Sequence, residues 1–139
     1  MPENSSPART VLIIDDEPLI LLVAGMTLEH AGFQILSALD GPAGIELFRQ
    51  QGDAVDAVLL DISLPVMSGE AVLDSLQQIR PDVPVLISSG FHPADVADRL
   101  GERRYADMIQ KPYRPAELVA KINAVLYDYL KDAQASGGI

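Results

Sequence analysis

The sequence predicts an α/β fold: a doubly wound, five-stranded parallel sheet with helices on both faces. The first observation is that short apolar runs without alternation, such as Val11–Ile14 and Ala57–Leu60, recur along the chain. Such runs are typical of strands that are buried on both faces. The second observation is that a helical pattern follows each run. Right-handed crossovers between parallel strands then place helices on both sides of the sheet.

Each element can be assigned from local signals. The expected strands cover residues 11–14, 33–37, 57–60, 84–88 and 107–110. The expected helices cover residues 18–31, 42–51, 70–79, 93–100 and 115–130. Gly32 and Gly52 directly follow two of these helices, and glycine is a common helix stop. We expect residues 1–9 to form a flexible arm, residues 10–131 to form the folded domain, and residues 132–139 to form a flexible tail.

Composition excludes several classes of protein. The 139 residues suffice for one domain with its own core. A net charge of -10 disfavours nucleic acid as a direct partner, because sequence-independent binding needs a basic surface. The absence of cysteine excludes disulfides and cysteine metal sites and fits a cytoplasmic setting. The start lacks a secretory signal, and the apolar stretch 18–24 is too short to span a bilayer, so no membrane association is expected.

Polar side chains stand where four of the strands end. Asp15 and Asp16 follow the first strand, and Asp61 follows the third. Ser89 follows the fourth strand and Lys111 the fifth. Ligands of such folds bind at the carboxyl ends of the strands, which lie at one edge of a parallel sheet. Chain order alone therefore predicts that these side chains meet.

Acidic groups gathered in this way indicate a particular chemistry. Three carboxylates repel one another, and a hard cation with oxygen ligands, such as Mg²⁺, offsets that repulsion. A carboxylate can also attack phosphorus and form an acyl phosphate. The cation and Lys111 would neutralise the phosphoryl charge, and the Ser89 hydroxyl would donate a hydrogen bond.

Each residue also has an ordinary interpretation when it is taken alone. Asp15 and Asp16 could cap the following helix, because aspartate is a preferred helix cap. Asp61 could be a turn residue, and Ser89 and Lys111 could be ordinary loop residues. These separate interpretations require that all the placements coincide by accident at one sheet edge, so the pattern favours a shared site.

Four segments carry a family resemblance: VLIIDDEP, VLLDISLPVMSGE, PVLISSG and IQKPYRPAEL. In order and spacing they resemble the receiver domain of bacterial two-component response regulators, over about residues 10–130. The resemblance implies a flavodoxin-like sheet with strand order 2-1-3-4-5. It also implies that Asp61 is the phosphoacceptor. Asp16, Asp61 and the backbone carbonyl of Ser63 would bind Mg²⁺ (or Mn²⁺) directly, and Asp15 would bind it through water.

The resemblance assigns roles to the other edge residues as well. Ser89 is similar to the switch hydroxyl of the family, and Lys111 to the lysine that pairs with the phosphate. Pro112 corresponds to the proline that follows this lysine through a cis peptide bond, which proline permits.

The chain departs from the family at one position. Receiver domains usually carry an aromatic switch residue three positions before the lysine, where this sequence has Met108. Tyr105 and Tyr113 lie nearby but not at the matching position. Phe91 could replace the ring, because PVLISSGF is similar to the PFxFATGY-type segment of a receiver subgroup. The alternative is that Phe91 makes only a hydrophobic contact under its loop.

The helix expected at 18–31 carries apolar residues on more than one side. A helix turns about 100° per residue, so one face is shared by Ile20, Val23, Ala24, Thr27 and Leu28, which we expect to meet the sheet. Leu22 and Met26 then point away, with Leu19 and Leu21 at the margins. Exposed apolar residues grouped on one helix often mark a docking site. The hypothesis is docking of the helical domain of a histidine kinase or phosphotransferase; a homodimer interface and a merely apolar surface are the alternatives.

The sequence thus supports a phosphoacceptor receiver domain in a two-component phosphorelay. It would accept a phosphoryl group from a histidine kinase or histidine phosphotransferase and signal by conformational change. It is not expected to be an enzyme beyond its own phosphorylation and dephosphorylation. A single-domain response regulator is the first expectation, because little sequence follows residue 130 and the chain starts with Met1. A receiver segment of a hybrid histidine kinase is the alternative.

Two other functions are less favoured. An aspartyl-nucleophile phosphatase would carry a second aspartate two residues after the nucleophile, where this chain has Ser63. A pseudo-receiver that acts only as a scaffold would not need the intact acidic set or Lys111.

Overall fold

The computed structural model describes the backbone of residues 8–137 and the side chains of residues 8–131. Its five strands form one parallel sheet in the order β2-β1-β3-β4-β5, which confirms the predicted fold. The strands are β1 (Thr10–Ile14), β2 (Gln34–Ala38), β3 (Ala57–Asp61), β4 (Val85–Ser89) and β5 (Asp107–Gln110). Of the segments expected to be flexible, 1–7 and 138–139 lie outside the described residues.

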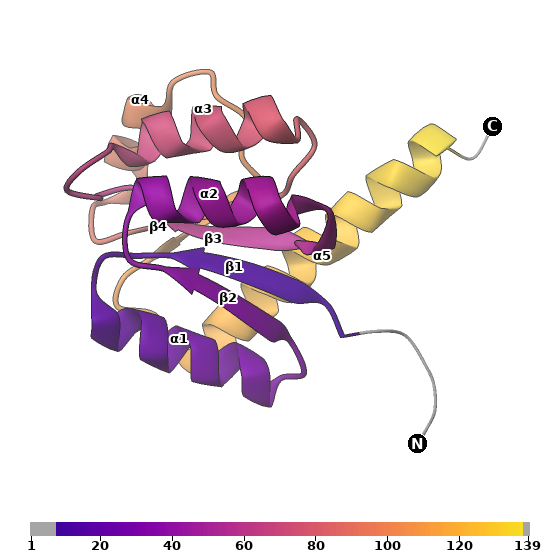
Figure 1. The fold of residues 1–139 in the computed structure, drawn as a ribbon, viewed down its shortest axis with the longest axis horizontal. Helices are drawn as coiled ribbons and strands as arrows, with labels where there is room; N and C mark the ends of the chain where they lie inside the picture. The colour runs from indigo at the N-terminus through magenta and orange to yellow at the C-terminus, as the bar shows by residue number, and fades with distance from the viewer. Residues whose placement is uncertain (1–7, 138–139) are drawn as a thin grey trace.

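The helices cover both faces of this sheet (Figure 1). They are α1 (Pro18–His30), α2 (Gly41–Gln51), α3 (Gly69–Ile79), α4 (Pro93–Leu100) and α5 (Pro115–Gly137), with a short 3₁₀ turn, η1 (Gly52–Ala54). One apolar cluster joins the sheet to α1 and α5, and another joins it to α2, α3 and α4. The protein therefore has three layers, as crossovers between parallel strands require.

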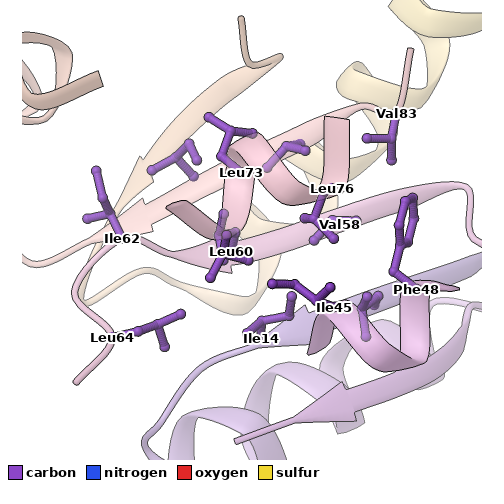
Figure 2. Close-up of a cluster of buried hydrophobic side chains, with 14 of the residues drawn as sticks. Ile14, Ile45, Phe48, Val58, Leu60, Ile62, Leu64, Leu73, Leu76 and Val83 are labelled. Carbon is purple, nitrogen blue, oxygen red and sulfur yellow. The ribbon is translucent and has the colours of Figure 1, made fainter. Parts of the chain in front are cut away.

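Alternation along the buried strands supplies both cores. Leu12 and Ile14 of β1 belong to the cluster under α2 and α3, whereas Val11 and Ile13 belong to the cluster under α1 and α5. Figure 2 shows part of the cluster under α2 and α3, with Phe48 among its labelled side chains. Full burial of one such side chain contributes roughly 2 kcal/mol, so these strands hold the sheet edge that carries the polar residues in a fixed position.

Local signals explain where several helices begin. The side chain of Asp40 accepts a hydrogen bond from the N–H of Ala43 at the start of α2. Ser68 does the same for Ala71 at the start of α3. Such caps satisfy backbone donors that the first helical turn leaves free. Gly32, with φ of 100°, follows the end of α1, as expected for a glycine stop.

The orientation of α1 differs from the prediction at one residue. Val23 was expected to face the sheet but is 48% exposed. Ala24, Gly25 and Leu28 are the buried residues of the helix, and Leu21 packs against the same core. Apolar residues surround this helix on all sides, so its sequence contains no clear polar face to orient it.

One expected helix end is confirmed, and another differs. α2 ends at Gln51 with Gly52 as its C-cap, as expected, although Gly52 has φ of -57° and leads into the 3₁₀ turn η1. The last helix, α5, runs past the expected end at Leu130 as far as Gly137. Alanine is a strong helix former, and its recurrence beyond residue 130 favours this continuation.

Candidate functional site

The carboxyl edge of the sheet gathers acidic side chains, as chain order predicts. Carboxylate oxygens of Asp15, Asp16, Glu17 and Asp61 lie within 4.8 Å of one another. Asp61 is the last residue of β3, and Asp15 and Asp16 follow β1 directly. Asp15 and Asp61 are almost fully buried, with exposed fractions of 2% and 3%. Burial prevents water from screening these charges, so the cluster needs positive charge nearby.

Lys111 supplies one positive charge. Its Nζ lies 2.8 Å from Asp15 Oδ2 and 3.2 Å from Asp61 Oδ2. A third oxygen, Oε2 of Glu17, is also 3.2 Å away. Burial alone would lower the pKa of Lys111, but the hydrogen bonds and charges of Asp15 and Asp61 outweigh burial and raise this pKa above its ordinary value of 10.5. Lys111 is therefore a permanent cation in the site.

The position of Lys111 is fixed by its neighbours. Its backbone N–H donates a 2.7 Å hydrogen bond to the carbonyl of Ser89. The Lys111–Pro112 peptide bond is cis, which confirms what the resemblance implied. Lys111 is thus held between the ends of β4 and β5.

Asp15 is held in a turn that leads into α1. Its Oδ1 accepts a 2.9 Å hydrogen bond from the N–H of Glu17. Burial raises the pKa of Asp15 above its ordinary value of 3.8, while hydrogen bonds from Lys111 and the Glu17 N–H act in the opposite direction. The N-cap of α1 is Glu17, which makes no side-chain capping bond, so Asp15 holds the turn before the helix and does not cap it. Its 2.8 Å ion pair with Lys111 places Asp15 in the shared site.

The donor set fits a hard divalent cation. Four carboxylates face a single ammonium group, so the site carries an excess of negative charge. All the candidate ligands are oxygen atoms, which Mg²⁺, Ca²⁺ and Mn²⁺ prefer. Asp16 and Asp61, the predicted direct ligands, both belong to this set.

The loop after Asp61 is closely packed. Asp61 Oδ1 accepts a 2.9 Å hydrogen bond from the N–H of Ser63, and the carbonyl of Ile62 accepts one of 3.1 Å from the N–H of Gly69. A Cβ atom at Gly69 would collide with the Ile62 backbone, so only glycine fits there without a shift. The role of the Ser63 carbonyl as a metal ligand stays a prediction.

Ser89 stands at the end of β4, on the strand next to Asp61. Its neighbour Ser88 is opposite Asp61 in the parallel pairing of β3 and β4. The Ser89 side chain is buried, and its Oγ accepts a 2.9 Å hydrogen bond from the N–H of Phe91. The hydroxyl is therefore beside the site and is engaged with the loop that leads to α4.

The predicted switch residues occupy different surroundings. Met108 is partly buried against the core under α3, whereas the Phe91 side chain is 50% exposed. Phe91 is therefore not a contact buried under its loop. Tyr113 packs against the core under α1 and α5. Its hydroxyl is buried without a hydrogen-bond partner among the described residues, and burial raises the pKa of Tyr113 to about 12.

Leu22 and Met26 are exposed on α1, as predicted, together with Leu19 and Val23. They form an apolar surface, which we call the α1 patch, on the helix that begins at the acidic cluster. A separate cavity of about 660 Å³ lies near the start of β4 and β5 and is lined in part by Arg104. That cavity is at the opposite edge of the sheet and does not belong to the acidic site.

Sequence reasoning did not include Glu17, although it directly follows Asp15 and Asp16. An acidic run at the end of a strand was the signal that could have revealed it. Sequence reasoning also did not single out Arg99, which binds Glu70 across α3 and α4. A contact between positions so far apart leaves no trace in a single sequence.

The comparisons with known proteins identify the family. A family model described as the response regulator receiver domain matches residues 11–123. The chain belongs to this family, which acts in two-component systems.

Individual relatives support the assignment. The chain is similar to a probable transcriptional regulatory protein, TcrX, of Mycobacterium tuberculosis, with 36% identity over 84% of this chain and 49% of that protein. A receiver domain structure from Clostridium thermocellum has a TM-score of 0.80 at 28% identity, covering 86% of this chain and 95% of that one. NtrX from Brucella abortus has a TM-score of 0.88 at 25% identity, covering 96% of this chain and 30% of that one.

The chain spans about half the length of the curated relatives it matches, 49% in the case of TcrX. Several of these relatives, TcrX among them, are named as transcriptional regulators, and only this portion of them is shared. Among residues 8–137, no helix is both long and apolar enough to cross a membrane.

Proposed function

We propose that Asp61 accepts a phosphoryl group from a phosphohistidine of a histidine kinase or a histidine phosphotransferase, in a reaction that depends on Mg²⁺. The observation that carries this proposal is the position of Asp61 at the end of β3, with Lys111 Nζ 3.2 Å from its Oδ2 and three further carboxylates around it. Membership of the receiver family supports the same assignment.

The proposed transfer is a substitution at phosphorus. A carboxylate oxygen of Asp61 forms a bond to phosphorus, and the bond between phosphorus and the donor imidazole nitrogen breaks. The electron pair of that bond leaves with the imidazole, and Asp61 becomes an acyl phosphate. Lys111, at hydrogen-bonding distance from Asp61, then pairs with the phosphoryl oxygens, and the Ser89 hydroxyl donates to another of them.

Asp16 and Asp61 would hold the Mg²⁺ ion, with Asp15 acting through water. When bound, Mg²⁺ supplies positive charge that stabilises the phosphoryl oxygens during transfer. Mn²⁺ has the same preference for oxygen ligands and would substitute for it.

The α1 patch is the proposed contact for the donor. Leu22 and Met26 expose apolar area beside the site, where a helical domain that presents a histidine would bury them. Leu22→Asp should slow transfer from the cognate donor, whereas Tyr127→Asp, at a similarly exposed position on α5, should not. Unchanged transfer to Leu22→Asp would show that the donor docks elsewhere.

The chain is proposed to act on itself alone and not as an enzyme for other substrates. Ser63, in place of a second aspartate, lacks the acid–base group that an aspartyl-nucleophile phosphatase uses. Incubation with a small phosphomonoester and Mg²⁺ should yield no repeated turnover. Sustained release of phosphate would favour the phosphatase instead.

The direct test of the proposal is phosphotransfer. Candidate histidine kinases, autophosphorylated with labelled ATP, should label the wild-type chain in the presence of Mg²⁺ and lose that ability when the metal is chelated. Asp61→Asn should remain unlabelled. Equal labelling of Asp61→Asn would mean that the phosphate is carried elsewhere.

A further inference from the structure

Arg99, on the last turn of α4, contacts three separate segments. Its Nε and Nη2 donate to both carboxylate oxygens of Glu70 on α3, at 3.1 and 2.8 Å. Nη2 also lies 3.4 Å from the carbonyl oxygen of Ile62. The guanidinium carbon is 5.9 Å from the centre of the Phe91 ring. Planar, bidentate contacts of this kind suit arginine and not lysine.

Two of these contacts lead directly to the proposed phosphorylation site. Ile62 is the residue after Asp61, and its own N–H donates to Ser88 of β4. Phe91 donates its N–H to the Ser89 hydroxyl. Arg99 is therefore joined to the loop that carries Asp61 and to the loop that carries Ser89.

These contacts matter because α4 has only a small buried contact with the rest of the domain. Val96 and Leu100 are the buried residues of this short helix, which lies next to α3 (Figure 1). Two ion pairs with α3 add to this small apolar contact: Arg99 with Glu70, and Arg103 with Asp74 at 2.9 Å. A helix with so little buried surface is readily shifted.

The surroundings of Met108 leave little room for the ring movement typical of the family. A void of only about 10 Å³ lies beside Ser89, Phe91 and Met108. That volume is about one water molecule and does not admit an aromatic ring. A group other than residue 108 must therefore transmit a change in the position of Ser89 to α4.

We propose that Arg99 is the positioning residue that couples phosphorylation of Asp61 to the position of α4. This inference rests on the proposed function. In the unphosphorylated chain Arg99 holds α4 against Glu70, the Ile62 carbonyl and the Phe91 ring. When the Ser89 hydroxyl turns to the phosphoryl group, the Phe91 N–H loses its acceptor and the ring leaves Arg99. The set of contacts that holds α4 then lacks the Phe91 ring, and α4 is held less firmly.

Hydrogen exchange in the segment 91–100 tests this coupling, with Mg²⁺ and beryllofluoride as the phosphoryl mimic. In the wild type the mimic should speed exchange in this segment by about fivefold or more. Arg99→Gln should exchange fast without the mimic and respond little to it. Arg103→Gln, which removes the neighbouring ion pair but no contact with Ile62 or Phe91, should respond as the wild type does.

Arg99→Lys separates the charge from the bidentate geometry and should behave like Arg99→Gln. Cooperative unfolding of each variant by circular dichroism confirms that it is folded. A wild-type response that persists in Arg99→Gln or Arg99→Lys overturns the coupling role while leaving the proposed function standing. If the mimic changes nothing around Asp61 in the wild type, the proposed function itself is wrong and the coupling fails with it.

Discussion

Asp16 offers a sharp test of the electrostatics of the acidic site. Its carboxylate lies with those of Asp15, Glu17 and Asp61, but the ion pairs of Lys111 are with the other three. Without a cation, Asp16 therefore adds mainly repulsion. With Mg²⁺ present it becomes a ligand. Asp16→Asn should consequently stabilise the metal-free protein and abolish most of the stabilisation by Mg²⁺.

The size of the first effect follows from the geometry. Two unit charges at 4.8 Å, the upper limit of the separations among these oxygens, interact with about 3.5 kcal/mol at an effective dielectric of about 20 and with about 0.9 kcal/mol in water. Asp16 is half-buried, and Asp15 and Glu17 remain its neighbours in the unfolded chain. The difference between the two states thus comes mainly from Asp61. We expect a gain of about 1 kcal/mol, or roughly 3 °C in Tm.

The second effect depends on metal concentration. At ten times its Kd, a cation that binds only the folded state adds about 1.4 kcal/mol to the free energy of unfolding. The wild type should show this gain in urea unfolding followed by circular dichroism, and Asp16→Asn should show little of it. Asp128→Asn removes an equal charge from an exposed position on α5 and is the matched control. Lower stability of metal-free Asp16→Asn, or a full Mg²⁺ gain in that variant, would refute the reasoning.

Three further predictions concern neighbouring groups. Lys111→Met leaves buried carboxylates without their cation and should cost about 3 kcal/mol in urea unfolding, with part restored by Mg²⁺; a loss below about 1 kcal/mol would contradict this. Tyr113→Phe removes a buried hydroxyl that has no partner among the described residues and should leave the free energy of unfolding equal or up to about 1 kcal/mol higher; a clear loss would reveal an unrecognised hydrogen bond. The hydrogen bond from Arg99, with the charge of Arg103, lowers the pKa of Glu70 below its ordinary value of 4.5. The ionised Glu70 carboxylate therefore stabilises the folded protein above pH 4.5. This stabilisation is lost as the pH falls through the pKa that Glu70 has in the folded state. The stability difference between wild type and Glu70→Gln should therefore shrink on acidification, and a constant difference would contradict the assignment.

The parts of the structure that the sequence predicts well depend on local pattern and chain order. The unbroken apolar runs of β1 and β3 identify buried strands, and Asp15 and Asp61 stand at their ends. Because the strands are parallel, their carboxyl ends lie at one edge of the sheet, and both carboxylates therefore lie at that edge. For this reason chain order alone predicts which residues form the site.

The parts that it predicts poorly depend on rotation and long-range contact. Val23 is exposed because a helix that is apolar on every side contains no signal for its rotation, and the neighbouring elements decide it. Arg99 meets Glu70 over a separation of 29 positions, and Glu17 reaches Lys111 over 94. A long, flexible charged side chain can pair with any of several groups of opposite charge. The fold decides which of these groups lies within its reach. The single-domain nature of the protein and its cytoplasmic setting stay predictions.

Locating the phosphate by mass spectrometry tests the central claim most directly. The chain would be incubated with a small phosphodonor such as acetyl phosphate and Mg²⁺, then digested and sequenced by fragmentation. We predict one phosphoryl group on the peptide that contains Asp61, sensitive to hydroxylamine as an acyl phosphate is. A phosphoryl group on any other residue would contradict this account of the acidic edge of the sheet.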